Sequence, residues 1–386
     1  MDYDPQSCER LPLWPRPVVM LPYVPESLPV TTLDFGRLIR LIGPANAALA
    51  RYDGLLQSVV NPSVMLSPLT NQEAVLSSKI EGTQATVDEV LEYEAGIEFD
   101  AEKVQDIQEI VNYRSALTLA QEALAQRPLN LALLRQMHGT LMSSVRGADK
   151  TPGQFRIHQN WIGSGNCTME QATFVPPSPL QLLDHLEAFQ RYLAGDDVDP
   201  LIQVAVVHAQ FELLHPFNDG NGRVGLLLIP LFLFQKRTLA SPMFYLSEYL
   251  ESHREEYYAK LRGISQQGDW TGWVEFFLTA IHHQAETNTA RVRGILDLYE
   301  RMKLRISELL RSQHALKVLD TLFDRPIFRS NDFVERSGIP KQSVSPFLKK
   351  LRDANIVSTL KEGGGRRPSI LAFAELLNIA EGRKII

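Results

Sequence analysis

The sequence predicts a mainly α-helical protein with very little β structure, and three observations support this. From Thr31 onward, apolar residues recur at spacings that share one helix face, as Leu38, Leu41 and Ile42 do. Runs that alternate apolar and polar residues, as half-buried strands do, are scarce. Hydrophobic residues make up 44% of the chain and charged residues 22%, which is ordinary for a globular protein. The 386 residues suffice for two or three domains with a sizeable core.

The first 30 residues are expected to be extended. Seven prolines lie between Pro5 and Pro29, and proline both fixes φ and removes an amide donor. No basic stretch followed by an apolar run is found there, so we predict no targeting segment. The longest apolar run, Val224–Phe234, has about half of the length that a bilayer span requires. We therefore predict a helix buried on all sides there, and no membrane partner.

Cysteine usage indicates the redox setting of the protein, and the net charge limits the partners that it can bind. The two cysteines, Cys8 and Cys167, form no Cys-x-x-Cys pair, which disfavours a disulfide scaffold or a thiolate zinc site and fits a reduced, cytoplasmic location. The formal net charge of −6 argues against a general polyanion binder.

Helical segments follow one another through the middle of the chain, and one hairpin interrupts them. The predicted helices span about 71–92 (interrupted at Gly82), 103–126, 130–143, 178–194, 200–214, 222–238, 249–264 and 270–311. Within Phe155–Val175, the turn formers Gly163–Asn166 lie between short apolar and aromatic runs, which predicts a small β-hairpin.

From about residue 312 the pattern changes. Three short helical stretches precede two apolar runs that flank a glycine-rich basic tip. The helical stretches are 313–323, 330–337 and 341–353, the apolar runs are Ile356–Leu360 and Ser369–Phe373, and the tip is Lys361–Pro368. Three helices and then two strands is the order of a winged helix-turn-helix, and Gly338 suits its turn, where a positive φ is often needed.

The most informative segment is His215-Pro-Phe-Asn-Asp-Gly-Asn-Gly-Arg-Val-Gly-Leu226. Its glycines precede a strongly apolar helix, so backbone amides and the helix dipole can form an anion site suited to phosphate. Asn221 and Arg223 add hydrogen-bond donors. Asp219 offers a carboxylate for Mg²⁺, and His215 has a pKa suited to acid–base work. A glycine-rich turn that caps a helix is the plainer alternative, but five functional groups within nine residues favour a nucleotide–Mg²⁺ site with a histidine base.

This segment resembles the signature of the Fic family, His-x-Phe-x-Asp/Glu-Gly-Asn-Gly-Arg-x-x-Arg, at all but its last position. Other stretches resemble the family's target-aligning flap, the region that completes its adenosine pocket, and its inhibitory motif Ser/Thr-x-x-x-Glu-Gly/Asn. They are, in that order, Gly153–Ile157 with Gln159–Gly163; Ser247–Tyr249, Tyr257-Tyr258 and Gly268–Trp270; and Ser77–Gly82. A C-terminal winged helix is also known in the subgroup with an inhibitory helix.

The resemblance implies a Fic helical core with a β-hairpin flap, plus the winged helix-turn-helix domain. We expect residues 1–100 to form an N-terminal region with an inhibitory helix at about 71–92. Residues 101–300 would form the catalytic core, and residues 301–386 the winged helix-turn-helix domain.

The activity that the resemblance implies is transfer of AMP from ATP to a Tyr, Thr or Ser hydroxyl of a target protein. His215 would take the hydroxyl proton, Asp219 would hold Mg²⁺, and Arg223 would neutralise the leaving pyrophosphate. The residues implied at the ATP site are Glu81, His215, Gly220, Asn221, Gly222, Arg223, Val224, Gly225, Leu226, Tyr257 and Tyr258. The inhibitory motif would consist of Ser77, Glu81 and Gly82. Phe217 is expected to be an apolar anchor beneath the loop, and His208 a buried structural histidine.

The chain departs from the signature at Leu226, where the family has arginine. In the family that arginine docks the γ-phosphate and pairs with the inhibitory glutamate, which is Glu81 here. Leucine can do neither, and the residues that follow it are apolar, so the sequence offers no replacement cation nearby. Loss of a charged phosphate contact is expected to cost about 1.5–3 kcal/mol of binding.

Two alternatives to AMP transfer are considered. The first is removal of AMP at the same site, with Glu81 positioning water. The second is a DNA-binding regulator, because residues 330–370 hold eight Lys/Arg against four Asp/Glu, and a basic recognition helix and wing would bind phosphates of duplex DNA. Winged helices also serve in dimers and in protein docking, so a homodimer is a further reading of the same unit.

Overall fold

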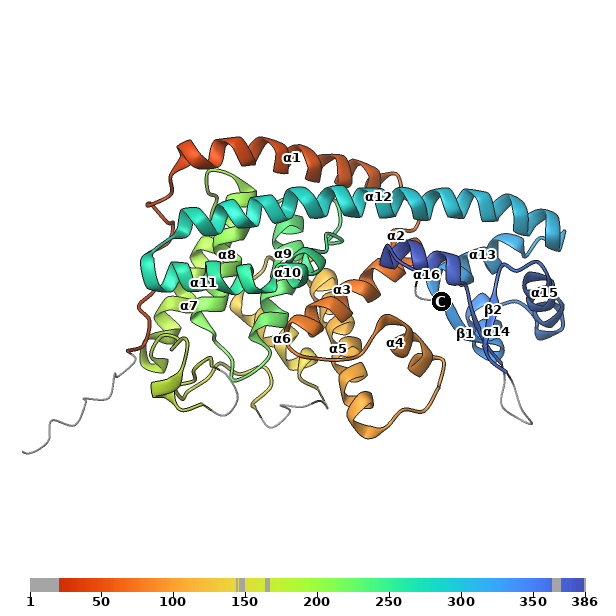
Figure 1. Ribbon diagram of the computed structural model, residues 1–386, viewed down its shortest axis with the longest axis horizontal. Coiled ribbons are helices and arrows are strands. Elements are labelled where there is room, and N and C mark those ends of the chain that lie inside the picture. The colour runs from red at the N-terminus through yellow and green to blue at the C-terminus, as the bar shows by residue number, and fades with distance from the viewer. Residues whose placement is uncertain (1–20, 144, 146–149, 164–166, 363–368, 385–386) are drawn as a thin grey trace, which may run out of the picture.

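Helices make up most of the computed structural model, which describes residues 21–143, 145, 150–163, 167–362 and 369–384 (Figure 1). Up to residue 267 they are α1 (Phe35–Gln57), α2 (Pro62–Met65), α3 (Ser67–Ile80), α4 (Val87–Glu94), α5 (Ala101–Leu124), α6 (Leu131–Leu141), the 3₁₀ turn η1 (Met169–Gln171), α7 (Pro179–Ala194), α8 (Pro200–Leu214), α9 (Asn221–Gln235), α10 (Ser247–Ser252) and α11 (Arg254–Gln267). The mainly helical fold class is confirmed. The prolines before residue 21, and the predicted tips at 164–166 and 363–368, lie outside the described residues.

The chain continues with α12 (Trp270–Leu310), α13 (Ala315–Asp324), β1 (Ile327–Arg329), α14 (Ser330–Ser337), α15 (Lys341–Asp353), β2 (Ser358–Lys361), β3 (Ile370–Ala372) and α16 (Ala374–Glu381). The long helix α12 passes through the boundary expected at residue 300, and α1 lies along its first half (Figure 1). Helix α12 packs against α8 in the centre of the molecule and against α13, α15 and α16 in the C-terminal region, so it connects the two regions.

The first helix begins at Phe35, four residues later than the apolar pattern suggested. Asp34 caps it, since its carboxylate accepts the Arg37 amide at 3.3 Å. The apolar face of α1, which includes Leu38 and Tyr52, is fully buried. The polar cap therefore sets where the helix starts, and burial against α12 sets which face turns inward.

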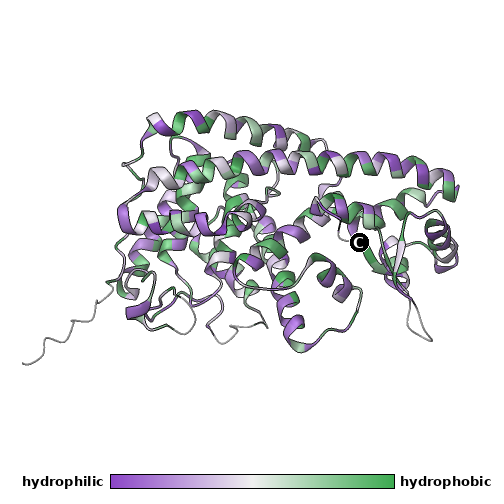
Figure 2. Cartoon of the chain, in the orientation of Figure 1, coloured by the Kyte–Doolittle hydropathy of each residue, from purple (hydrophilic) through white to green (hydrophobic). Residues whose placement is uncertain are grey.

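The centre of the molecule is formed by α8 and α9, which are hydrophobic along most of their length (Figure 2). Asp199 caps α8 by accepting the amides of Leu201 and Ile202 at 2.8 and 3.3 Å. From Asn221 to Leu233 every residue of α9 is buried, as the apolar run predicted. Among the residues described, no helix is long and apolar enough to cross a membrane.

The hairpin predicted over Phe155–Val175 is present only as a single antiparallel bridge. Ile162 pairs with Phe174, and its amide donates to the Phe174 carbonyl at 2.8 Å. The returning chain forms the η1 turn, so no paired strand develops among the described residues there. A two-stranded ribbon with an unpaired edge is marginal without a third strand.

The C-terminal region contains the predicted helices in order and a three-stranded antiparallel sheet with strand order β1-β3-β2. Gly338 ends α14 with φ at +62°, as expected for the turn. The sequence did not predict β1, whose three residues are too few to show an alternating pattern.

One predicted helix is broken in the structure. The stretch 249–264 divides at His253 into α10 and α11, because His253 leaves helical geometry at φ −118° and ψ 33°. The break turns α11 across the end of α8, where it can line a site beside the motif.

Candidate active site

The fold places His215 at the end of α8 and holds its backbone from the flap. His215 is in the left-handed region with φ at +45°, and its amide donates to Phe211. The Arg156 guanidinium donates to the carbonyls of His215 and Pro177 at 2.9 and 2.6 Å. Asn160 of the flap donates to the Phe217 carbonyl at 3.0 Å. Flap and motif are therefore one hydrogen-bonded unit.

The imidazole of His215 is neutral at physiological pH. Burial, and after it the nearby positive charge of Arg156, lower its pKa to about 4. Its Nδ1 has no hydrogen-bond partner among the described residues. A neutral ring with a free nitrogen, partly open to solvent, is suited to accept a proton.

The start of α9 has the backbone geometry expected of an anion site. Gly220 precedes the helix with φ at +73°, and no side chain in the described ranges caps this end. The first amides of a helix have no partner within it, so those of Asn221, Gly222 and Arg223 are available to an anion. Asp219 lies next to them with an exposed carboxylate, which accepts the Gly220 amide at 2.6 Å.

The side chain of Asn221 has a different role from the phosphate donor expected. Its Oδ1 accepts the Phe217 amide at 2.8 Å and its Nδ2 donates to the Phe217 carbonyl at 2.9 Å. Both polar atoms are thus used to brace the loop, and Asn221 is only 1% exposed. Any phosphate contact from this residue would come from its backbone amide. Phe217 is fully buried, in agreement with the anchor expected there.

Arg223 is buried beside a carboxylate of α5. Its Nη1 lies 3.3 Å from Glu109, which also accepts a hydrogen bond from the Thr83 hydroxyl at 2.7 Å. Nε and Nη1 of Arg223 have no hydrogen-bond partner within the described part of the chain. A buried guanidinium with spare donors, beside the free amides of α9, adds to the positive character of this corner.

Glu81 reaches the same corner from the end of α3. A Cβ added to Gly222 would lie 2.0 Å from Glu81 Oε1, so the carboxylate stands directly against the first turn of α9. Although part of Glu81 is open to solvent, surrounding protein raises the pKa of its carboxyl by desolvation, and Arg223 and Arg254 oppose this. Arg254 comes from α11 and also donates to the Ile80 carbonyl at 2.6 Å. Arg254 of α11 is therefore a positive charge near Glu81 that the apolar residues after Leu226 could not reveal.

Several of the residues expected at the site are buried. Val224 and Leu226 are at most 2% exposed, and Ser77 is fully buried in α3. Tyr257 is 3% exposed, and its hydroxyl pairs with Nε2 of the buried His208 at 2.9 Å. Tyr257 therefore packs inside, and His208 is structural, as its sequence context indicated. The helical pattern could not reveal which of the two adjacent tyrosines turned outward.

Tyr258, by contrast, lines a cavity of about 90 Å³ between the flap, the end of α8 and α11. The lining residues are Ile162, Thr173, Phe174, Glu212, Leu213, Tyr258, Leu261, Arg262 and Ser265. Most of this lining is apolar, and Oε1 of Glu212 has no hydrogen-bond partner in the described ranges. Gly225 packs beside Glu212, since a Cβ there would lie 2.0 Å from Glu212 Oε1.

Asp219 is the residue with the chemistry to hold a divalent cation. Among the described residues, no three His, Cys, Asp or Glu side chains gather into a metal site. One exposed carboxylate next to a phosphate-binding turn nevertheless fits Mg²⁺, which proteins hold through one or two carboxylates plus substrate phosphates and water.

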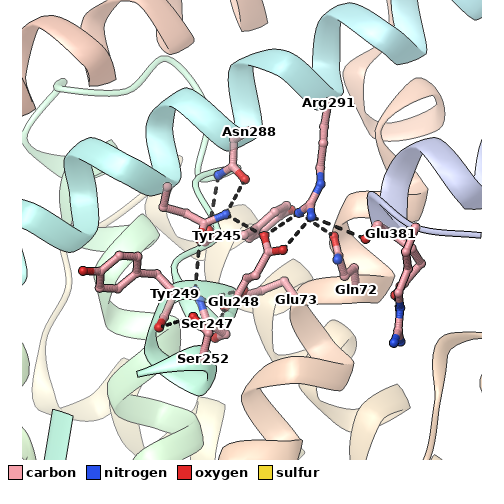
Figure 3. A network of polar contacts seen from close by, with 12 residues as sticks. Gln72, Glu73, Tyr245, Ser247, Glu248, Tyr249, Ser252, Asn288, Arg291 and Glu381 are labelled. Carbon is pink, nitrogen blue, oxygen red and sulfur yellow. Dashed lines mark hydrogen bonds and ion pairs between the residues drawn. The ribbon is translucent and has the colours of Figure 1, made fainter. Parts of the chain in front are cut away.

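A polar network fixes α3, the helix that ends at Glu81 (Figure 3). Arg291 of α12 donates to Gln72 of α3 at 3.2 Å and to both oxygens of Glu248 in α10, at 2.5 and 2.6 Å. It also reaches the Glu381 carbonyl of α16 at 3.5 Å. Burial raises the pKa of the neighbouring Glu73 to about 8. The position of α3 is therefore tied to α10, α12 and α16.

Sequence reasoning missed three side chains that support the site. His138 of α6, Glu109 of α5 and Arg156 of the flap lie far from the motif in sequence and carry no spacing signal. The available clue to Arg156 was its place inside Gly153–Ile157, the stretch that resembles the family's flap.

Two family models match the chain side by side. Residues 39–122 match the model described as Fic/DOC family N-terminal, and residues 128–233 match the model described as Fic/DOC family. The second range contains the whole motif and the flap, and the first contains Glu81.

Known proteins are similar at low identity. A Caenorhabditis elegans protein named protein adenylyltransferase fic-1 is 25% identical over 198 residues, which is 50% of this chain and 35% of that protein. The chain thus spans about a third of that relative. An Aquifex aeolicus (strain VF5) protein named probable protein adenylyltransferase aq_aa38 is 22% identical over 265 residues, 67% of this chain and 72% of that protein.

Solved structures show the same fold. A Fic family protein from Desulfovibrio desulfuricans G20 gives a TM-score of 0.57 at 19% identity, covering 92% of this chain and 98% of that one. Fic-1 (aa134 - 508) from C. elegans gives 0.52 at 19% identity, covering 68% and 73%. With both family models matched and the motif in place at the start of α9, residues 39–122 and 128–233 of this chain are Fic/DOC family domains.

Proposed function

We propose that this protein transfers AMP from ATP to a hydroxyl side chain of a target protein. The observation that carries the proposal is the position of His215 beside the start of α9: burial lowers the pKa of its imidazole to about 4, and its Nδ1 has no hydrogen-bond partner among the described residues. The names of two relatives support it, since the C. elegans protein is called a protein adenylyltransferase and the Aquifex protein a probable protein adenylyltransferase.

The reaction assigns one task to each group. The target hydroxyl gives its proton to His215 while its oxygen bonds to the α-phosphorus of ATP. The bond from that phosphorus to the bridging oxygen breaks, and pyrophosphate leaves with the electron pair. The α9 amides and Arg223 stabilise the negative charge on the phosphates, and such preorganised electrostatics usually dominate phosphoryl-type transfer. The cavity beside Tyr258, of about 90 Å³, would receive an edge of the adenine base.

Bound Mg²⁺ would neutralise phosphate charge and orient the polyphosphate. Asp219 would hold it, and the Gly220 amide, which donates to Asp219 at 2.6 Å, orients that carboxylate.

We further propose that Glu81 restrains this activity. Its carboxylate stands against Gly222, where the helix dipole and free amides would otherwise face a phosphate. A negative charge at that point repels the polyphosphate or shifts it out of line. The resemblance to the Fic family extends the proposal to a Tyr, Thr or Ser hydroxyl of the target.

The decisive test is incubation of the pure protein with Mg²⁺ and α-labelled ATP in a cell lysate. Label should appear on protein, whereas γ-labelled ATP should leave none. If AMP is instead released from protein that was labelled beforehand, with no transfer in the forward direction, the enzyme removes AMP and the transfer proposal fails.

The pH dependence of the reaction should reflect the depressed pKa of His215. Because burial and Arg156 lower that pKa to about 4, the ring stays unprotonated as the pH falls below 6.5. We expect the acidic limb of kcat/KM for ATP to have its midpoint well below 6.5. Far-UV circular dichroism over the same range separates this limb from unfolding. A midpoint at or above 6.5 contradicts the environment assigned to His215.

DNA binding by the C-terminal region is a second candidate function. Lys341, Lys349 and Arg352 are exposed on α15, as is Lys361 on β2. Cations on an exposed helix face provide phosphate contacts in helix-turn-helix proteins.

This second function has its own prediction. The double variant Lys349→Glu/Arg352→Glu should weaken binding to duplex DNA and reduce the salt slope of log K by about 1 per lost contact, measured by fluorescence anisotropy. Arg40→Glu/Arg51→Glu, the same charge change on exposed residues of α1, serves as control. Equal binding by both variants, or none by the wild type at low salt, would exclude this function.

A further inference from the structure

We infer that His138, in the last turn of α6, is a positioning residue that holds the flap and the Asp219 loop in register. The inference rests on the proposed function, since Asp219 and the flap are the parts that it would align. The two ring nitrogens bind two different segments: the Gly153 amide donates to Nδ1 at 2.8 Å, and Nε2 lies 2.9 Å from the Asp219 carbonyl.

The hydrogen-bond pattern fixes the tautomer of His138. A backbone N–H can only donate, so Nδ1 must accept from Gly153 and the ring proton must lie on Nε2. Nε2–H then donates to the Asp219 carbonyl, which can only accept. Both bonds exist together only in this neutral form. The ring is fully buried, and no water is needed to complete either bond.

Packing leaves the ring little freedom. It stacks on Phe217 with centroids 3.8 Å apart and planes 3° from parallel. On its other edge, a Cβ added to Gly220 would lie 3.5 Å from the ring. The imidazole is thus held between the anchor of the motif loop and the turn that starts α9, so movement of the ring would move both.

α6 holds Gly153 from a second side as well. Gly153 has φ at +74°, and a Cβ there would lie 3.0 Å from the Arg135 carbonyl. The Arg135 guanidinium donates to the Gly153 carbonyl at 2.7 Å. Gly153, the first residue of the flap, is therefore fixed to α6 at both its amide and its carbonyl. Of the two α6 residues that hold it, Arg135 and His138, only His138 also bonds to Asp219.

The consequence for the reaction is geometric. Under the proposed function, the flap would set where a target hydroxyl lies, and the Asp219 loop would set where the polyphosphate lies. A displacement of about 1 Å between reacting groups can cost roughly a hundredfold in rate. A side chain that bonds to both segments therefore aligns nucleophile and phosphorus without touching either.

Two variants separate the two bonds. In His138→Asn, the side-chain oxygen replaces Nδ1 as acceptor for Gly153, but nothing reaches Asp219. In His138→Gln, the longer amide places its nitrogen near the former Nε2 and keeps the bond to Asp219, but the acceptor for Gly153 is lost. Loss of a single such hydrogen bond typically changes an equilibrium about three- to tenfold.

Each variant should change one of two measurements and leave the other unchanged. Neither measurement needs a target protein. His138→Asn should raise the Mg²⁺ concentration for half-maximal ATP binding about three- to tenfold, and leave amide exchange at residues 153–157 near the wild-type rate. His138→Gln should speed exchange at 153–157 by a similar factor and leave the Mg²⁺ dependence unchanged. Both variants should slow AMP transfer.

Other outcomes overturn the inference. If both variants change both measurements in proportion to their thermal unfolding temperatures, His138 is only a core residue. If neither variant changes either measurement, the register does not depend on it. Should one variant fail to fold, the other still tests its own bond by the same two measurements. Because ATP binding and exchange do not require transfer, a wild type without transferase activity would defeat the proposed function and leave this inference separately testable.

Discussion

Replacing His215 with alanine is expected to reduce transfer of label from α-labelled ATP by at least about 100-fold, the lower end for loss of a general base. The Kd for ATP should change by no more than about twofold, because the imidazole acts on the target hydroxyl and not on the phosphates. Single-turnover transfer and equilibrium binding of ATP measure the two quantities on the same preparation. Transfer at the wild-type rate would remove His215 from the mechanism.

The backbone at position 215 requires a matched control. His215 has φ at +45°, where residues without special tolerance of the left-handed region are strained. Asparagine adopts this region more readily than alanine and cannot act as a base at neutral pH. His215→Asn should therefore lose transfer as His215→Ala does, while keeping its unfolding temperature closer to that of the wild type. Arg156 bonds to the backbone carbonyl of residue 215, so both variants retain that contact.

The part of the site that the sequence could predict lies in one continuous segment. Residues 215–226 form the end of one helix, a turn and the start of the next, so their mutual geometry follows from local rules. The left-handed Gly220 and the uncapped start of α9 follow directly from glycines before an apolar run.

The supporting side chains could not be predicted, because tertiary packing alone brings them to the motif. His138 and Glu109 lie in ordinary amphipathic helices, and only the folded chain places them next to Asp219 and Arg223. The same limit explains Tyr257. Two adjacent tyrosines on α11 point in different directions, and which of them is buried depends on where His208 lies.

Fold prediction failed where segments were short. The strand β1 spans three residues and is stable only because β3 pairs with it. The break between α10 and α11 has no proline or glycine to mark it, and the helical pattern runs through His253 without a change. Long helices such as α12 were predictable because their apolar period repeats many times.

Glu81 lies among other positive groups, although position 226 has no arginine to pair with it. In place of a direct ion pair from position 226, the carboxylate has the helix dipole of α9 and the charges of Arg223 and Arg254 around it. Leu226 is 2% exposed and contributes only packing. Glu81 is therefore attracted to this corner without being tied to a single partner.

Variants at positions 81 and 226 should show two opposing effects of the missing arginine. Glu81→Gly removes the restraint, but ATP still lacks the contact that docks its γ-phosphate, so automodification should rise by less than about tenfold. Glu81→Gly with Leu226→Arg supplies that contact, worth about 1.5–3 kcal/mol, and should raise automodification a further ten- to hundredfold, roughly. Leu226→Arg alone should lower activity below the wild type, because the new guanidinium would pair with Glu81 and fix it against Gly222.

The variant series also needs a control for burial. Position 226 is enclosed, so Leu226→Gln, which is polar but uncharged, measures how far a polar side chain there disturbs the fold, through its unfolding temperature. If Leu226→Arg fails to fold, Glu81→Gln still tests the restraint, because it keeps the size of the side chain and removes its charge. If charge is what excludes the phosphate, automodification by Glu81→Gln should match that of Glu81→Gly within about threefold. If the missing arginine at position 226 limits ATP docking, activation by Glu81→Gly alone should be modest. Activation by about a hundredfold or more would mean that ATP docks productively without an arginine at position 226, with Arg223 and the α9 amides sufficient for the polyphosphate.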